Sequence, residues 1–480
     1  MRPWLQTLPA AAFPEQVFPP MPGRLVYAVT AGERADLEVG RHYAAGTALC
    51  AAGQPQFLPL AARLICVSTE TLVFAPEASH PTGPEPASLP VPPAPMRVRM
   101  VRPGIEDLIE RARTFGIAGH GGAGFPLWKK LEGAQARSPS ILVVNAVECE
   151  PGLAGDGALL ALEPERVARG FEALVHVYSP QRALLAAHTS EPARRLGCEA
   201  LVVPGGYPAG DERQICRQLG RPLGYRERSL DAGVLMLNVG TVAALGDALD
   251  GIAPNRRFVT VHGPAVARPS VLPAWLGTPL NDVLEAAAMN TALADDRGGS
   301  LGLRVGGLMM GTDVAPAQWR ADEDAISRQI GVAQSTTGLY LRERLDASPA
   351  QPCINCQRCD AVCPQHLPVA RLWQALDRQD AQATAPLLDG CNQCRCCDLV
   401  CPSGIGLADA FGAARLEVGE QARAAALANW YAGRYQAHQR REQERNAARE
   451  RRRERRDGSA RPQLADLLKA GRRRRRRPGV

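Results

Sequence analysis

The N-terminal part of the chain is patterned as short apolar runs separated by turn residues. Leu25–Val29, Leu64–Val67 and Thr71–Phe74 have the length and composition of β-strands. We therefore predict a small all-β module within residues 1–95, which ends in a stiff proline-rich linker, Pro76–Pro95.

Helical and buried-strand patterns alternate over residues 96–256, which predicts an α/β domain. The expected elements are a helix opening at Ile105, strands Ile141–Val144, Leu201–Val203 and Val234–Val239, and a helix Pro164–Val177. Polar residues follow two of these strands, and the carboxyl ends of strands are where α/β sheets bind ligands.

The second half of the chain divides into three further regions. Residues 257–335 return to short strands around one helix, and we interpret them as a β-grasp-like (SLBB) domain. Residues 336–416 hold two cysteine runs with helical segments after each. Residues 417–480 are rich in Ala, Arg, Glu and Gln, which predicts a long helix or a disordered tail. The fold class expected is multidomain α/β and α+β.

Length, composition and apolar runs indicate where in the cell the protein is expected. With 480 residues the chain is too long for one core, and 45% hydrophobic and 22% charged residues are typical of a folded soluble protein. No apolar run approaches the roughly 20 residues that span a bilayer. The first residues, Met1–Ala12, are too weakly patterned for a secretory signal. We expect a cytoplasmic protein whose membrane contact is peripheral.

Nine of the 14 cysteines lie between Cys353 and Cys401. The first run is Cys353-x2-Cys356-x2-Cys359-x3-Cys363-Pro364, and the second is Cys391-x2-Cys394-x2-Cys397-x3-Cys401-Pro402. Three cysteines at this spacing wrap a cubane and a fourth, before proline, completes it, so we predict two [4Fe–4S] clusters. Structural zinc, the alternative, has no use for the third cysteine.

In two-cluster ferredoxins the fourth cysteine of each run ligates the other cluster. Cys353, Cys356, Cys359 and Cys401 are thus expected to hold one cluster, and Cys391, Cys394, Cys397 and Cys363 the other. Cys396 lies outside the spacing, and we expect its side chain to point elsewhere.

A glycine-rich loop, Gly119–Pro126, contains a formal G-x-G-x-x-G, but it follows a helix rather than a strand. By itself it could be a structural turn. Lys129 and Lys130 add positive charge, which phosphate binding needs. The strand-end segments Asn145–Gly152 and Asn238–Thr241 add amides, carboxylates and a hydroxyl. Together these residues predict a pocket for a phosphorylated cofactor beside an electron relay.

These motifs resemble those of the C subunit of the Rnf (ion-translocating oxidoreductase) electron-transport complex, a relative of the NADH-binding flavin subunit of respiratory complex I. The resemblance covers roughly residues 20–415. It is carried by Gly119–Pro126, Asn145–Pro151, Tyr207–Glu212, Asn238–Thr241, Leu276–Pro279, Gly306–Gly311 and the two cysteine runs.

The resemblance implies FMN and NADH as cofactor and substrate. It implies that Gly119, Gly121, Gly122, Gly124 and Lys130 approach the phosphate and nucleotide, and that Asn145, Glu148 and Asn238 contact the flavin. Thr241 belongs to the same strand-end set. Glu150 would lie at the hydride-transfer face as the catalytic residue, and Phe125 could stack on the nucleotide.

The family also implies a place in the cell and partners: the cytoplasmic side of a bacterial inner membrane, with other subunits of a membrane complex. The N-terminal module resembles a biotinyl/lipoyl-like barrel-sandwich domain. No lysine precedes Lys129, so no swinging arm can be attached.

The basic tail could be a solvated face, a contact with anionic lipid, or a contact with RNA or another acidic partner, although no specific nucleic acid is expected. Two other functions stay open for the whole chain. One is a relay subunit without flavin or NADH, and the other is a soluble flavin-linked dehydrogenase.

Overall fold

The computed structural model describes residues 24–28, 35, 37–45, 47–50, 56, 58, 62–67, 71–76, 103–267, 269–287, 301–319, 329–343 and 349–474. The chain forms two compact units, Met1–Asp409 and Ala410–Val480. Among the described residues, no helix combines the length and the apolar character that crossing a membrane requires.

The N-terminal module contains a four-stranded antiparallel sheet in the order β1-β4-β3-β2. Its strands are β1 (Leu25–Ala28), β2 (His42–Tyr43), β3 (Ala62–Val67) and β4 (Thr71–Pro76). Leu25, Leu64 and Phe74 are fully buried in its core. Pro76 closes β4, and the rest of the predicted linker, 77–95, lies outside the described residues, as does Met1–Ala12.

The α/β domain is built on a parallel sheet in the order β7-β6-β5-β8. Its elements are α1 (Ile105–Thr114), α2 (Leu127–Arg137), β5 (Ile141–Asn145), α3 (Gly155–Leu162), α4 (Pro164–Tyr178), β6 (Arg182–Ala187), α5 (Glu191–Arg195), β7 (Glu199–Val202), α6 (Glu212–Gln218), η3 (Ser229–Ala232), β8 (Val234–Asn238) and α7 (Val239–Leu249).

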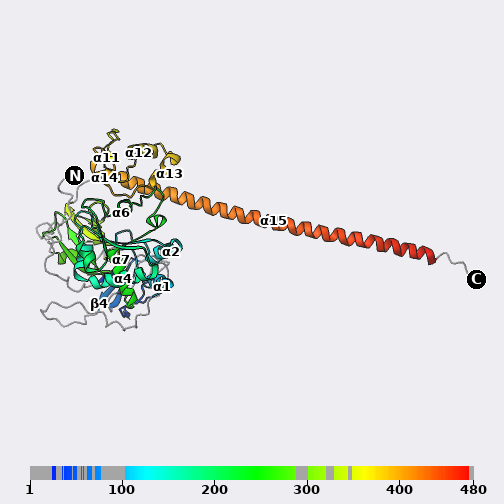
Figure 1. The fold of residues 1–480 in the computed structure, drawn as a ribbon, viewed down its shortest axis with the longest axis horizontal. Helices are drawn as coiled ribbons and strands as arrows, with labels where there is room; N and C mark the ends of the chain where they lie inside the picture. The colour runs from blue at the N-terminus through cyan, green and yellow to red at the C-terminus, as the bar shows by residue number, and fades with distance from the viewer. Residues whose placement is uncertain are drawn as a thin grey trace, which may run out of the picture. The chain divides into compact units, whose positions relative to one another are not determined.

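Alternate residues of each strand enter two separate cores, because successive side chains of a strand point to opposite faces. Leu142 and Val144 of β5 pack with residues of α1, α2, α4 and α7. Ile141 and Val143 pack on the other face with Ile215 of α6. The helices α1, α2, α4 and α7, labelled in Figure 1, therefore cover one face of this sheet.

The third domain is a five-stranded sheet in the order β10-β9-β13-β11-β12. Its elements are β9 (Arg256–His262), β10 (Ser270–Trp275), α8 (Leu280–Ala286), β11 (Leu301–Val305), β12 (Thr312–Val314), α10 (Pro316–Trp319) and β13 (Gly338–Glu343). The central strand β13 lies beyond residue 335, where we expected the domain to end. It belongs here because it pairs with both β9 and β11, and because Leu339 and Leu341 fill this core.

The cysteine module contains α11 (Arg358–Val362), α12 (Val369–Asp377), α13 (Ala381–Leu388) and α14 (Cys396–Val400). It is followed by α15, a single helix of 68 residues from Leu407 to Arg474 (Figure 1). Of the two states predicted for the tail, the structure has the helix over the described residues 417–474. It begins ten residues before Glu417, inside the region assigned to the cysteine module.

Candidate functional site

Two asparagines lie side by side at the carboxyl edge of the parallel sheet. Asn145 ends β5 and Asn238 ends β8, and the strand register pairs them directly. The Asn145 Nδ2 donates to the carbonyl of Gly210 at 2.9 Å. The Asn238 Oδ1 accepts from the N–H of Gly240 at 2.9 Å and so caps α7, which begins at Val239 rather than continuing the strand. Both amides are therefore held in place where such sheets bind ligands.

The glycine loop lies over the end of β8. A Cβ on Gly121 would contact the Asn238 side chain at 3.6 Å, and the N–H of His120 donates to Thr241 Oγ1 at 2.9 Å. The loop is closed by a hydrogen bond of 2.8 Å from the N–H of Gly119 to the carbonyl of Phe125. The predicted cofactor loop and the predicted strand-end residues are thus brought together.

Backbone conformation explains two of the loop's glycines. Gly122 has φ of +99° and Gly124 has φ of +60°, a region that side chains with a Cβ avoid. The side chain of Phe125, which follows them, is 45% exposed. An exposed aromatic ring beside this loop has a free face for stacking.

Glu148 lies partly buried at the N-terminus of α3. Its carboxylate accepts from the N–H groups of Asp156 and Gly157, each at 2.9 Å. The neighbouring carboxylate of Asp156 accepts from Asn238 Nδ2 at 2.6 Å. Burial raises the pKa of both carboxyls, and the charge of Asp156 raises that of Glu148 further. The pair therefore favours holding a proton at the sheet edge.

Glu150 is held by the third domain. Its Oε1 accepts from the N–H groups of Met309 and, at 3.0 Å, Met310. A Cβ on Gly307 would overlap the Glu150 side chain at 1.9 Å, so this approach requires glycine. Burial raises the pKa of Glu150, and the two amides partly oppose the rise. The predicted catalytic carboxylate is thus fixed by the Gly306–Gly311 segment.

Lys130 is placed differently from the other predicted residues. Its Nζ lies 3.7 Å from Glu212 Oε1, at the start of α6, and its side chain is partly buried. This ion pair directs the ammonium group toward α6. The structure does not give Lys130 a hydrogen bond to the glycine loop among the described residues.

Three residues near the site were not predicted from the sequence. The buried Arg257 donates to the carbonyl of His120 at 3.3 Å and also contacts Gln334. Burial lowers the pKa of His120 to about 3, with the charges of Arg257 and Arg166 adding to the effect. His120, Asp156 and Arg257 line one small pocket behind the loop. His120 was visible as a variable position of the glycine motif, whereas Arg257 comes from another domain and left no local signal.

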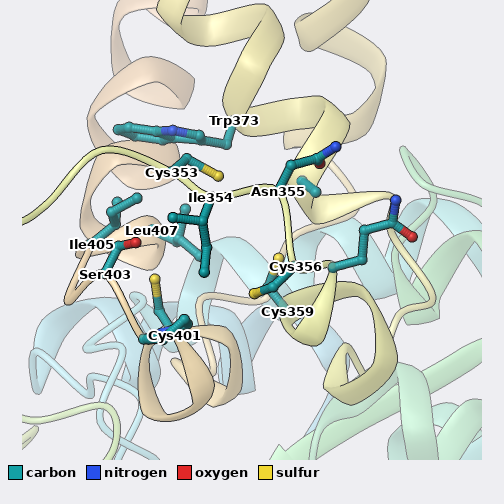
Figure 2. Close-up of a pocket in the computed structure, with 13 residues that line it drawn as sticks. Cys353, Ile354, Asn355, Cys356, Cys359, Trp373, Cys401, Ser403, Ile405 and Leu407 are labelled. Carbon is teal, nitrogen blue, oxygen red and sulfur yellow. The ribbon is translucent and has the colours of Figure 1, made fainter.

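The first cysteine set surrounds one pocket. Figure 2 shows Cys353, Cys356, Cys359 and Cys401 lining it: the first two come from the loop before α11, Cys359 from α11 itself, and Cys401 from the residue after α14. The apolar side chains of Ile354, Trp373, Ile405 and Leu407 also line it, together with the polar Asn355 and Ser403. Four thiols around an apolar cradle fit a cubane, whose thiolates bind different irons and so need to be spread around it.

The second set, Cys363, Cys391, Cys394 and Cys397, also gathers. Burial raises the pKa of Cys397, and the neighbouring Asp398, Cys394 and Cys391 add to the rise. Burial also raises the pKa of Cys363, with Cys394 among its neighbours. Cys363 is therefore near Cys394 of the second run, and crossed ligation stays a prediction.

Two further observations concern the cysteine side chains. Cys396 does not point elsewhere as we expected, because its thiol hydrogen-bonds Cys394. Across the described part of the chain, no three His, Cys, Asp or Glu side chains converge in the arrangement that would hold a metal ion.

The second set is the one that contacts the sheet edge. The hydroxyl of Tyr207 donates to the carbonyl of Cys394 at 2.8 Å. The Gln365 Nε2 donates to Asp211 Oδ1 at 3.1 Å, and the Gln214 Nε2 donates to the carbonyl of Pro364 at 2.8 Å. Burial raises the pKa of Tyr207, and Glu150 is the largest charged contributor. Tyr207 is therefore near Glu150 as well as in contact with the second cysteine run.

The chain resembles known proteins over part of its length. The family model described as the Nuo51 FMN-binding domain matches residues 112–247. The C subunit of the ion-translocating oxidoreductase complex of Klebsiella pneumoniae is 33% identical over 296 residues, 58% of this chain and 37% of that protein. Its namesake from Citrobacter koseri is 33% identical over 293 residues, 58% of this chain and 39% of that protein. The chain thus spans less than two-fifths of these relatives.

Among solved structures, an NAD+-reducing [NiFe]-hydrogenase in its air-oxidized state is similar with a TM-score of 0.42 at 19% identity. The likeness covers 64% of this chain and 60% of that chain.

Proposed function

We propose that this chain has the role of the C subunit in an ion-translocating oxidoreductase complex. Its motifs predicted a resemblance to such subunits, and the matched proteins confirm that resemblance. In this proposal it is the peripheral subunit of such a complex, on the cytoplasmic side of a bacterial inner membrane. It takes electrons from NADH through FMN and relays them to partner subunits, while the complex translocates ions. When bound, FMN supplies the exchange of a hydride for single electrons, and [4Fe–4S] clusters carry electrons one at a time.

The observation that carries this proposal is the hydrogen bond from Tyr207 to the carbonyl of Cys394. It ties the second cysteine run to the sheet edge that holds Asn145, Asn238 and Glu150. An electron relay needs its first carrier close to the flavin. This hydrogen bond would keep the second cysteine set close to a flavin at the sheet edge. The match of the FMN-binding family model to residues 112–247 supports the flavin on the other side of the contact.

The chain's own residues would divide the work at the sheet edge. Asn145 and Asn238 offer amides to the flavin, and Thr241 and the Gly119–Gly124 loop surround the N-terminus of α7, where a phosphate is favoured. Glu150, positioned by the amides of Met309 and Met310, would orient the nicotinamide. The two cysteine sets would then be ordered, with the second set inside and the first outside.

A relay subunit without flavin is the second candidate, and one observation favours it. The side chains of Asn145, Asn238, Glu148 and Glu150 already have hydrogen-bond partners within the chain. Lys130 is paired with Glu212. To bind here, FMN would have to replace some of these hydrogen bonds and ion pairs with its own.

Anaerobic purification of the full chain separates the two candidates. We expect about eight irons and one FMN per chain, with NADH bleaching the flavin absorbance. Eight irons without FMN and without a response to NADH would leave the relay as the function. Glu150→Gln is expected to keep FMN and slow the bleaching, and unchanged bleaching would remove the role of Glu150.

Asn238 offers a matched pair of variants. Asn238→Ser keeps a side-chain oxygen that can cap α7, whereas Asn238→Ala removes it. If the amide binds flavin, both variants lose FMN. If Asn238 only caps the helix, the serine variant retains FMN and the alanine variant alone is destabilised.

A further inference from the structure

The charge of the chain is concentrated in its last part. Residues 417–480 contain 18 arginines and one lysine against eight acidic residues. The preceding 416 residues contain 37 basic and 41 acidic residues. The tail is therefore a cationic element attached to a slightly acidic protein, and arginine rather than lysine supplies the charge. Guanidinium groups bind phosphate oxygens in pairs, which makes arginine the better residue for a phosphate-bearing partner.

Six of the tail's 18 arginines lie along one line of α15. Steps of three or four residues connect Leu427, Tyr431, Arg434, His438, Arg441, Arg445, Arg449, Arg452 and Arg456. All nine side chains are exposed. The steps average close to 3.6 residues, so the line runs straight along the helix for roughly 40 Å. We call these nine residues the Leu427–Arg456 stripe.

The N-terminal end of the stripe is aromatic. Trp430 is 52% exposed and Tyr435 is 64% exposed, and both flank Leu427 and Tyr431 on the helix surface. The guanidinium of Arg434 lies 4.7 Å from the Trp430 ring centre. Tryptophan and tyrosine prefer the boundary between lipid headgroups and acyl chains, because each has an apolar ring and a polar edge. This end of the stripe offers apolar surface, and the rest offers positive charge.

Acidic residues lie mostly away from the stripe. Four glutamates fall between Arg441 and Arg456, and three of them, Glu444, Glu450 and Glu454, occupy other sides of the helix. Three arginines of the same segment, Arg451, Arg453 and Arg455, also lie off the line, as does Arg440 just before it. Segregation of this kind indicates a face that meets a flat anionic surface, since a uniformly solvated helix has no reason to separate its charges.

We propose that the Leu427–Arg456 stripe binds the surface of an anionic lipid bilayer. Leu427, Trp430, Tyr431 and Tyr435 enter the headgroup boundary, and the arginines of the stripe bind lipid phosphates. A second copy of the helix fits the stripe poorly. In a parallel pair of helices, Arg434, Arg441 and Arg445 would face the same arginines of the other copy and repel them. The proposal does not depend on flavin or iron–sulfur chemistry.

The test is binding of the full-length protein to phosphatidylglycerol-containing vesicles, measured by flotation, with pure phosphatidylcholine vesicles as the reference. The triple variant Arg441→Gln/Arg445→Gln/Arg452→Gln removes three stripe charges. Its matched control, Arg440→Gln/Arg451→Gln/Arg455→Gln, removes three charges from the same segment off the stripe. Each arginine near the surface contributes roughly fivefold, so we expect the stripe triple to weaken binding by about a hundredfold. The control should weaken it several-fold.

The aromatic end is tested separately. Leu427→Gln/Trp430→Gln should leave vesicle binding that high salt abolishes, whereas the native protein keeps part of its binding through the apolar contact. Equal losses in the two arginine triples would overturn the proposal in favour of diffuse attraction. So would tighter binding to polyuridylate than to the vesicles at the same salt concentration, or equal binding to neutral and anionic vesicles. None of these readouts involves NADH, so they are independent of the proposed electron transfer.

Discussion

The two cysteine runs have the same backbone conformation but different surroundings. The first is Cys353–Cys363 and the second is Cys391–Cys401. Each run places two non-glycine residues at positive φ at matching positions, Asn355 and Gln357 in the first and Gln393 and Arg395 in the second. In each, an aspartate accepts a backbone N–H ten residues later, Asp360 from Ala370 and Asp398 from Ala408. Local spacing therefore produces the same loop twice.

The surroundings of the runs are not repeated. Cys353 and Cys356 are exposed, whereas Cys394 and Cys397 are buried. The second run docks on the α/β domain: the hydroxyl of Tyr207 donates to the carbonyl of Cys394, and Arg213 of α6 donates to the carbonyl of Asp389, two residues before Cys391. The difference teaches that one repeated cysteine pattern can be placed in two environments, because contacts outside the pattern decide which copy is covered.

The largest expected effect tests whether the runs share their ligands. Cys353→Ser/Cys401→Ser removes two thiols from one crossed set and should leave about half the iron. Cys353→Ser/Cys363→Ser removes one thiol from each set and should lose nearly all of it. Iron and sulfide analysis of the anaerobically purified proteins measures both. The reverse order of iron content would show that each run ligates its own cluster.

The next effect tests the difference in exposure. Cys363→Ser leaves only the first set complete, and Cys401→Ser leaves only the second. A chelator should strip iron from the Cys363→Ser protein about tenfold faster, because the first set needs little local opening to be reached. The loss of visible absorbance with time gives both rates. Equal rates would mean that docking does not protect the second set.

The stability of the protein should depend on pH through the carboxyl groups at the sheet edge on which the second run docks. Burial raises the pKa of Glu148 and Asp156, so the folded state keeps a proton that the unfolded state releases. The free energy of unfolding should therefore fall as pH rises from the ordinary carboxyl range toward the raised values, by at least about 1 kcal/mol.

Glu148→Gln should flatten this dependence, and Glu165→Gln, on an exposed part of α4, should preserve it. Urea unfolding at about pH 5 and about pH 8 measures the difference. A stability that rises over this interval in the native protein would contradict the assigned direction.

The smallest effect concerns the contact between the regions. Tyr207→Phe removes the hydrogen bond to Cys394 and should cost about 1 kcal/mol of docking. In the Cys401→Ser background it should also speed chelation of the second set. Tyr225→Phe is the control, because Tyr225 packs against Gly390 on the same docking face. Equal effects of both substitutions would assign the loss to packing rather than to the hydrogen bond.

Much of the α/β domain could be predicted because its strands are continuous apolar runs. Strand β6, Arg182–Ala187, was missed, since it begins with arginine and is rich in alanine, which has little preference for strands. Strand β13 was assigned to the wrong region because its partners β9 and β11 are distant in sequence. Local patterns therefore indicate that a strand forms, but not always where it pairs.

The candidate site divides in the same way. Asn145 and Asn238 were predictable, because polar residues at strand ends stand out after apolar runs. Arg257 and the amides of Met309 and Met310 were not, because they reach the site from the third domain. No local pattern marks a residue whose role depends on a contact with a distant segment.

The sequence by itself determined the cysteine spacing, the glycine loop and the order of polar strand ends, because each depends on residues close together in the chain. Tertiary structure alone decided that Cys394 and Cys397 of the second run are buried, whereas Cys353 and Cys356 of the first run are exposed. It also decided that Glu150 is held by another domain. These features depend on burial and on contacts between distant segments, which only the folded chain brings together.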